Sequence, residues 1–158
     1  EWLEEKGGAV PLMPSSGLAR AETRRITAWF DDKFYNEVGR LITYEKIDRR
    51  FKGDSDGGGG PDMATVRVGL HNLNLHMEYL SHLLDQRVWL AGNDLTMADL
   101  TAAAHLSCLD FTGDVPWKNW PLVRDWYAKL KSRPSFRPLL ADHVAGMRPP
   151  PYYTDLDF

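Results

Sequence analysis

The segment from Met63 to Leu84 constrains the fold of this chain more than any other. Its apolar side chains recur every three or four residues without a break, at Met63, Val66, Leu70, Leu73, Met77, Leu80 and Leu84. This spacing places them along one face of an α-helix, whereas a strand would need a period of two. Pro61 suits the first turn of such a helix. We therefore predict a long helix that ends near Gln86 and buries one face against its neighbours.

The rest of the chain follows the same helical period. A pattern runs from Leu18 toward Phe51, and its apolar stripe consists of Ile26, Phe30, Phe34, Val38 and Leu41. Further helices are expected after Thr96, over 121–132 and over 135–142, each bounded by proline, glycine or capping residues. The four glycines of 57–60 predict a mobile loop between the first two helices. No segment alternates with the period of a strand, so the sequence predicts an all-α helical bundle with about five main helices.

Thr96 and Asp99 form a capping-box pattern in the stretch LTMAD. Thr96 would stand at the N-cap, and Asp99 at the third helical position would accept a hydrogen bond from the N-cap backbone. The Asp99 carboxylate would also lie at the positive end of the helix dipole. An acid in an apolar stretch could be catalytic, but this spacing favours a structural role for it.

The composition excludes several classes of function. The formal net charge is −3, and the 19 basic residues are spread among 22 acidic ones, which argues against a nucleic-acid footprint. A single cysteine rules out an intramolecular disulfide and fits a cytoplasmic location. No apolar run approaches the length of a membrane span. None of the five histidines pairs at i, i+4, and no catalytic Ser-His-Asp pattern is visible, so the residues predict no metal, no cofactor and no catalytic group.

The chain ends in PPPYYTDLDF, an unusual terminus because it is aromatic and acidic. The prolines predict an extended segment after Gly146. Tyr and Phe are efficient interface anchors, and the aspartates would suit a basic patch on a partner. The tail could equally fold back onto its own helices, and the residues alone leave the two interpretations open.

Several stretches resemble the C-terminal, all-helical domain of the glutathione transferase superfamily. EWLEE is similar to the end of that superfamily's thioredoxin-like domain, and PLMPSSGLARAETRRITAWFDDKF to its linker and first long helix. LAGNDLTMAD is the most specific match, because in the superfamily this capping box nucleates a buried core helix. NWPLVRDWYAKLKSRPSFRPLLAD resembles the helix pair that closes the domain. The resemblance implies the end of a thioredoxin-like domain and linker at 1–8, a helical domain at 9–142 and a tail at 143–158.

The ending DHVAGMRPPPYYTDLDF narrows the resemblance to a family of alphaproteobacterial, glutathione transferase-like division proteins. Members of that family bind the tubulin-like protein FtsZ, and are thought to bridge and curve its filaments as homodimers. The resemblance implies a cytoplasmic binding protein recruited to the division site, without demonstrated transferase activity. The tail positions implicated in FtsZ binding would be Tyr152, Tyr153, Asp155, Leu156, Asp157 and Phe158.

An enzymatic interpretation stays open beside this one. The full-length protein could be a glutathione transferase or a maleylacetoacetate isomerase-like enzyme that uses glutathione. The helical domain would then form the apolar co-substrate pocket, and the tail would cover it. The pocket residues in that case would be Trp29, Phe30, Lys33 and Phe34.

Overall fold

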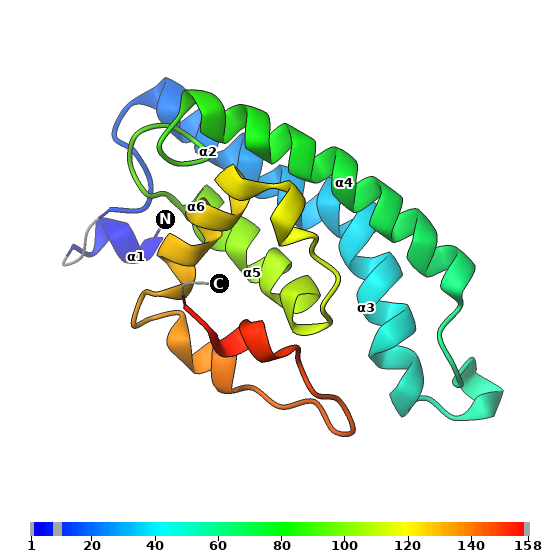
Figure 1. The fold of residues 1–158 in the computed structure, drawn as a ribbon. Helices are drawn as coiled ribbons and strands as arrows, with labels where there is room; N and C mark the ends of the chain where they lie inside the picture. The colour runs from blue at the N-terminus through cyan, green and yellow to red at the C-terminus, as the bar shows by residue number, and fades with distance from the viewer. Residues whose placement is uncertain (1, 8–10, 157–158) are drawn as a thin grey trace.

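A computed structural model describes residues 2–7 and 11–156, and within them the chain is built from helices (Figure 1). The main helices are α1 (Trp2–Glu5), α2 (Gly17–Ala28), α3 (Arg40–Lys46), α4 (Met63–Gln86), α5 (Met97–Phe111) and α6 (Pro121–Lys131). A π-helical segment, η1 (Trp29–Gly39), joins α2 to α3, and short 3₁₀ turns are η2 (Asp48–Phe51), η3 (Asp54–Asp56), η4 (Trp117–Asn119), η5 (Arg137–Ala141) and η6 (Pro151–Thr154). This arrangement confirms the predicted all-α fold. No helix among the described residues is long and apolar enough to cross a membrane.

The segments α2, η1 and α3 form one continuous rod from Gly17 to Lys46. The buried residues of this rod recur every four positions, at Ile26, Phe30, Phe34, Val38 and Ile42. An α-helix turns by about 100° per residue, so a strict repeat of four would drift by about 40° at every step. The wider π turn in the middle compensates for this drift, because it takes more residues per turn. The stripe therefore ends on Ile42, and Leu41, which the sequence pattern favoured, is only half-buried.

Helix α4 runs back along the rod, as the green and blue ribbons of Figure 1 show. It ends at Gln86, as the sequence predicted, but its N-cap is Asp62, so Pro61 lies before the helix and not in its first turn. The two helices come closest at Gly69, where a Cβ atom would lie 2.8 Å from the side chain of Ile42. Any larger residue at position 69 would therefore force α3 and α4 apart.

The glycine-rich segment between α3 and α4 follows a path that is closed by hydrogen bonds. Glu45 accepts hydrogen bonds from the Arg49 guanidinium (2.6 Å) and from the backbone N–H of Asp62 (2.7 Å), which brackets the segment. Gly57 has a φ of +79°, and a Cβ on Gly58 would lie 2.1 Å from the Lys52 carbonyl oxygen. These glycines allow a tight turn that other residues could not form.

Helix α5 lies at the centre of the bundle and contacts α2, η1, α3 and α6. Its small residues Ala98, Ala102 and Ala103 are fully buried and let the surrounding helices approach closely. At its N-terminus, Thr96 and Asp99 form the capping box. The Asp99 carboxylate is fully buried, and it also accepts hydrogen bonds from the backbone N–H of Leu90 (2.9 Å) and the indole N–H of Trp126 (3.0 Å).

The C-terminal tail folds back onto the domain, and the predicted extended segment is wrong for 151–154, although Pro150 and Asp155 on either side are extended. Pro151–Thr154 form the 3₁₀ turn η6, which lies beside the C-terminal end of α5 (Figure 1, red). The turn forms because the N–H groups of Tyr153 and Asp155 reach back to the carbonyls of Pro150 and Tyr152. Proline suits the first position of such a turn, since its fixed φ is already helical.

Candidate partner-binding groove

Tyr153 anchors the tail to the domain. Its side chain is only 3% exposed, its ring packs edge-on against Phe111 with the centroids 5.4 Å apart, and its hydroxyl donates to the Leu139 carbonyl (3.2 Å). Burial raises the pKa of this phenol to about 12. The ring therefore stabilises the tail against its own domain, and it is not a surface that a partner could contact in this conformation.

Beneath the tail lies a buried polar cluster on the inner faces of α5 and α6. The carboxylate of Asp110 accepts from the indole N–H of Trp117 (2.7 Å) and from the hydroxyl of Tyr127 (3.3 Å). The ammonium of Lys131 lies 3.6 Å from the same carboxylate and donates to the backbone carbonyl of Tyr152 (3.0 Å). Burial raises the pKa of Asp110 and lowers that of Lys131. The cluster thus connects the core of the domain to the backbone of the tail.

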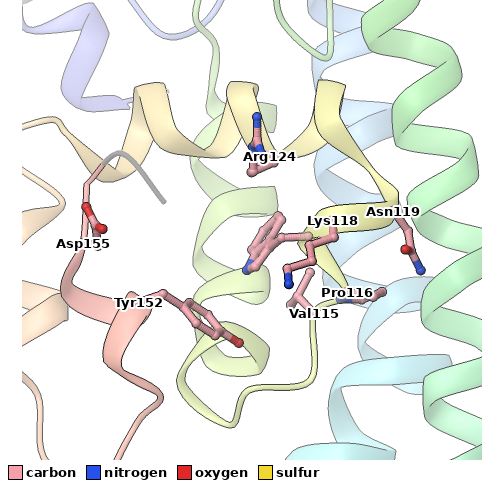
Figure 2. Close-up of a pocket in the computed structure, with 8 residues that line it drawn as sticks. Val115, Pro116, Lys118, Asn119, Arg124, Tyr152 and Asp155 are labelled. Atoms are coloured by element: carbon pink, nitrogen blue, oxygen red, sulfur yellow. The ribbon is translucent and has the colours of Figure 1, made fainter.

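A groove of about 550 Å³ opens between the tail, the segment that follows α5, and α6 (Figure 2). It is lined by Val115, Pro116, Trp117, Lys118, Asn119, Arg124, Tyr152 and Asp155. In Figure 2 the Tyr152 ring points from the tail toward Val115, while Asp155 stands at the edge of the groove. Burial raises the pKa of the Tyr152 phenol. One wall of the groove therefore consists of the tail itself.

The chemistry of this groove suits non-covalent recognition. Its lining combines apolar and aromatic residues with the cations Lys118 and Arg124 and the anion Asp155. None of its described lining residues is a serine, cysteine or histidine, the usual nucleophiles and bases of hydrolytic sites. Among the described residues, no three His, Cys, Asp or Glu side chains are arranged to hold a metal ion. An apolar side chain flanked by charged groups would fit such a site.

The six tail residues expected at an interface fall into three groups. Tyr152 and Asp155 line the groove, and Leu156 follows them in a half-buried position. Tyr153 is buried against Phe111. Asp157 and Phe158 lie outside the described residues. Glu1 and the expected boundary at 8–9, between the thioredoxin-like end and the helical domain, also lie outside them.

The four residues of the enzymatic interpretation do not line this groove. Phe30 and Phe34 are buried core residues of the rod. Trp29 is half-buried, and its indole N–H donates to Nδ1 of His76 (3.1 Å). Lys33 is exposed and pairs with Glu37 on the same helix. Trp29 and Phe34 thus pack against His76 of α4, and Phe30 packs against His105 of α5.

Two buried charged residues beside the groove were not predicted from the sequence, although the pattern around each indicates a buried position. Asp110 stands in the apolar stretch LSCLDF at the end of α5, where a charged residue is unusual. Lys131 lies four residues after the inward-facing Tyr127, which places it on the buried face of α6. Each signal marks a buried charge, but neither identifies its partner.

The fold and its helix order define a class of protein. A family model described as the glutathione S-transferase, C-terminal domain, matches residues 64–134. The helical domain also superimposes on glutathione transferase F7 from Populus trichocarpa with a TM-score of 0.72, over 87% of this chain and 64% of that one, at 19% identity, which shows the fold alone. The class is therefore a glutathione transferase-type C-terminal helical domain.

The chain belongs, more narrowly, to the family of FtsZ-localized protein A. It is 46% identical to that protein from Caulobacter vibrioides over all of its 158 residues, which cover 68% of the relative. The structure of FzlA from C. crescentus matches with a TM-score of 0.93 at 46% identity, over 99% of this chain and 68% of that one. A glutathione S-transferase from Rhodospirillum rubrum matches with a TM-score of 0.92 at 46% identity, over 99% and 69%. These findings confirm the family resemblance of the sequence.

Proposed function

We propose that this protein is a cell-division protein that binds FtsZ filaments, and that its groove and tail form the contact. The observation that carries this proposal is the 46% identity to FtsZ-localized protein A, which extends through the tail to the end of the chain. The protein would be cytoplasmic and recruited to the division site by this contact. It would act as a binding protein and not as an enzyme.

The geometry of the tail supports this proposal. A free terminus loses much conformational freedom when it binds, and this cost weakens the complex. Here Tyr153 and Lys131 already hold the turn η6 in place, so Tyr152 and Asp155 are presented in a fixed arrangement. The charges of Lys118, Arg124 and Asp155 would set the register of the partner and speed its association.

A homodimer would present two such grooves. Once one groove holds a filament, the second binds at a high effective concentration, so two weak contacts give strong overall binding. If the two grooves were fixed at an angle, the dimer could bridge filaments and impose curvature on them. This mechanism requires no tight single-site contact.

The test is co-sedimentation of the full-length protein with FtsZ filaments assembled with GTP. Asp155→Arg reverses the charge of an exposed groove residue that also interacts electrostatically with Lys131, and we expect it to reduce pelleting several-fold. Asp85→Arg makes the same charge change at an exposed position near the end of α4 and should pellet like the wild type. Equal pelleting of both variants would place the contact elsewhere on the domain. If the wild type itself stays in the supernatant, the FtsZ proposal fails and a glutathione conjugation assay of the full-length protein becomes the next measurement.

A further inference from the structure

Lys131 is the most unusual side chain near the groove, because it is a lysine with 0% exposure. Its ammonium donates to the Tyr152 carbonyl (3.0 Å) and lies 5.8 Å from the centroid of the Tyr153 ring. Replacing a buried ion pair with apolar residues often stabilises a protein, so a lysine at this position is not explained by stability alone. A role in fixing the tail would explain it.

The Tyr152 carbonyl is the point at which Lys131 acts on the groove. This oxygen also accepts the N–H of Asp155 (3.1 Å), which closes the turn η6. Lys131 therefore holds the backbone oxygen that links Tyr152 to Asp155 in the turn. These are the two tail residues that line the groove. Both the ammonium and the neutral amine can donate to a carbonyl, so the contact does not depend on the charge of Lys131.

Asp110 fixes the other end of this connection. Its carboxylate is held by Trp117 and Tyr127 and lies 3.6 Å from the Lys131 nitrogen. Trp117 is itself a lining residue of the groove. One buried cluster thus holds the tail wall and the facing wall of the same groove.

We propose that Lys131 is a positioning residue for partner binding: it fixes the tail wall of the groove, with Asp110 as its support, and does not touch the partner. This inference rests on the proposed function, since it assigns Lys131 a role in the binding of FtsZ. Without its N–H donor, the turn η6 detaches more often, and Tyr152 and Asp155 are no longer held facing Lys118 and Arg124.

The experiment compares Lys131→Met with Lys129→Met in the full-length protein. Methionine keeps the length and the apolar stem of lysine but has no donor. Lys129 lies on the same helix, is exposed and sits 5.9 Å from the Trp89 ring centroid, so its substitution tests the loss of a lysine from α6 alone. Two quantities are measured: amide hydrogen exchange of peptides covering 150–156, and the amount of protein that pellets with FtsZ filaments.

We expect Lys131→Met to raise amide exchange in 150–156 by about tenfold, the size of the loss of one hydrogen bond from a charged donor. Exchange in α4 should stay unchanged, and pelleting should fall several-fold. Lys129→Met should change neither quantity. A role of Lys131 in general stability would instead raise exchange throughout the domain and would overturn the inference.

The two proposals fail in distinguishable ways. Unchanged exchange in 150–156 would overturn the positioning role of Lys131, whatever happens to FtsZ binding. Faster exchange with unchanged pelleting would overturn its role in binding, provided that Asp155→Arg still reduces pelleting. If the wild type does not pellet, the FtsZ proposal fails while the exchange measurement still decides whether Lys131 holds the tail. If Lys131→Met does not fold, Asp110→Asn combined with Lys131→Met removes both buried charges and takes its place in the same measurements.

Discussion

The two ends of helix α5 each carry a fully buried carboxylate, Asp99 at the first turn and Asp110 at the last. Both accept an indole N–H, from Trp126 and Trp117 respectively. They differ in their other partners. Asp99 is held by Leu90 and Thr96, which lie within nine residues of it, whereas Asp110 is held by Tyr127 and Lys131 from another helix.

This difference separates a local folding element from a contact between the core and the candidate groove. Asp99 accepts hydrogen bonds from the backbone N–H and hydroxyl of Thr96 at the helix start, and from the N–H of Leu90 in the preceding loop. Asp110 lies near the negative end of the helix dipole, which does not favour a carboxylate. Instead, Asp110 lies beside Lys131, whose nitrogen donates a hydrogen bond to the tail backbone. The first acid helps the helix to form, and the second connects the helix to the groove.

The largest expected effect is the difference between Asp99→Asn and Asp110→Asn. At position 99 the new amide NH₂ would replace a carboxylate oxygen that accepts hydrogen bonds. One or two buried N–H groups would then lose their acceptor, so we expect a loss of about 3 kcal/mol in unfolding free energy. At position 110 the amide oxygen can still accept from Trp117, the NH₂ can donate to the Tyr127 hydroxyl, and Lys131 keeps the Tyr152 carbonyl. We expect about half the loss there. Urea denaturation followed by circular dichroism measures both.

The result would contradict the comparison if Asp110→Asn cost as much as Asp99→Asn. Such an outcome would mean that Lys131 remains charged in the variant after the loss of the buried Asp110 carboxylate, which is expected to cost more than a lost hydrogen bond. The double substitution of Asp110→Asn and Lys131→Met would then recover part of the loss.

A smaller effect is expected from removing the two indole donors, and here function separates them. Trp126→Phe and Trp117→Phe each remove one hydrogen bond to a carboxylate and should each cost about 2 kcal/mol. Trp117 also lines the groove, so Trp117→Phe should weaken FtsZ pelleting, whereas Trp126→Phe should leave the pelleting of the folded protein unchanged. Equal pelleting of the two variants would remove Trp117 from the proposed site.

The sequence predicted those features that depend on local order. The helix at 63–86 and the Thr96–Asp99 pattern follow from spacing within one segment, and the structure has both. The π turn in the rod was missed because a repeat of four residues resembles a repeat of 3.6 over a few turns. The path of the glycine segment depends on Glu45, Arg49 and Asp62, whose contacts lie outside the segment itself.

The tail shows the same limit at the candidate site. Its aromatic and acidic residues suggested a contact surface, but the sequence left open whether this surface faces a partner or the domain. In the structure Tyr153 is buried against the domain, while Tyr152 and Asp155 line the groove. Which tyrosine points inward is decided by Phe111 and Leu139, which are distant in sequence and carry no motif. Long-range partners of this kind are also what hid Lys131.

His76 extends the comparison to a buried group of another kind, an imidazole, and it carries the smallest expected effect. Its Nδ1 accepts the Trp29 N–H (3.1 Å), so the ring is neutral and its Nε2 donates to Glu37 (3.0 Å). Burial lowers the pKa of His76 in the folded protein below its ordinary value of 6.5. As the pH falls below about 6.5, His76 binds a proton in the unfolded chain but not in the folded protein, so the unfolding free energy declines. The decline ends once the pH falls below the folded-state pKa. The loss is at most about 1.4 kcal/mol per pH unit.

His76→Gln keeps an acceptor for Trp29 and a donor for Glu37 but cannot titrate, so its unfolding free energy should decline less than that of the wild type between pH 7 and 5.5. Parallel pH profiles for the two proteins would show that His76 takes up its proton without opening the contact between the rod and α4.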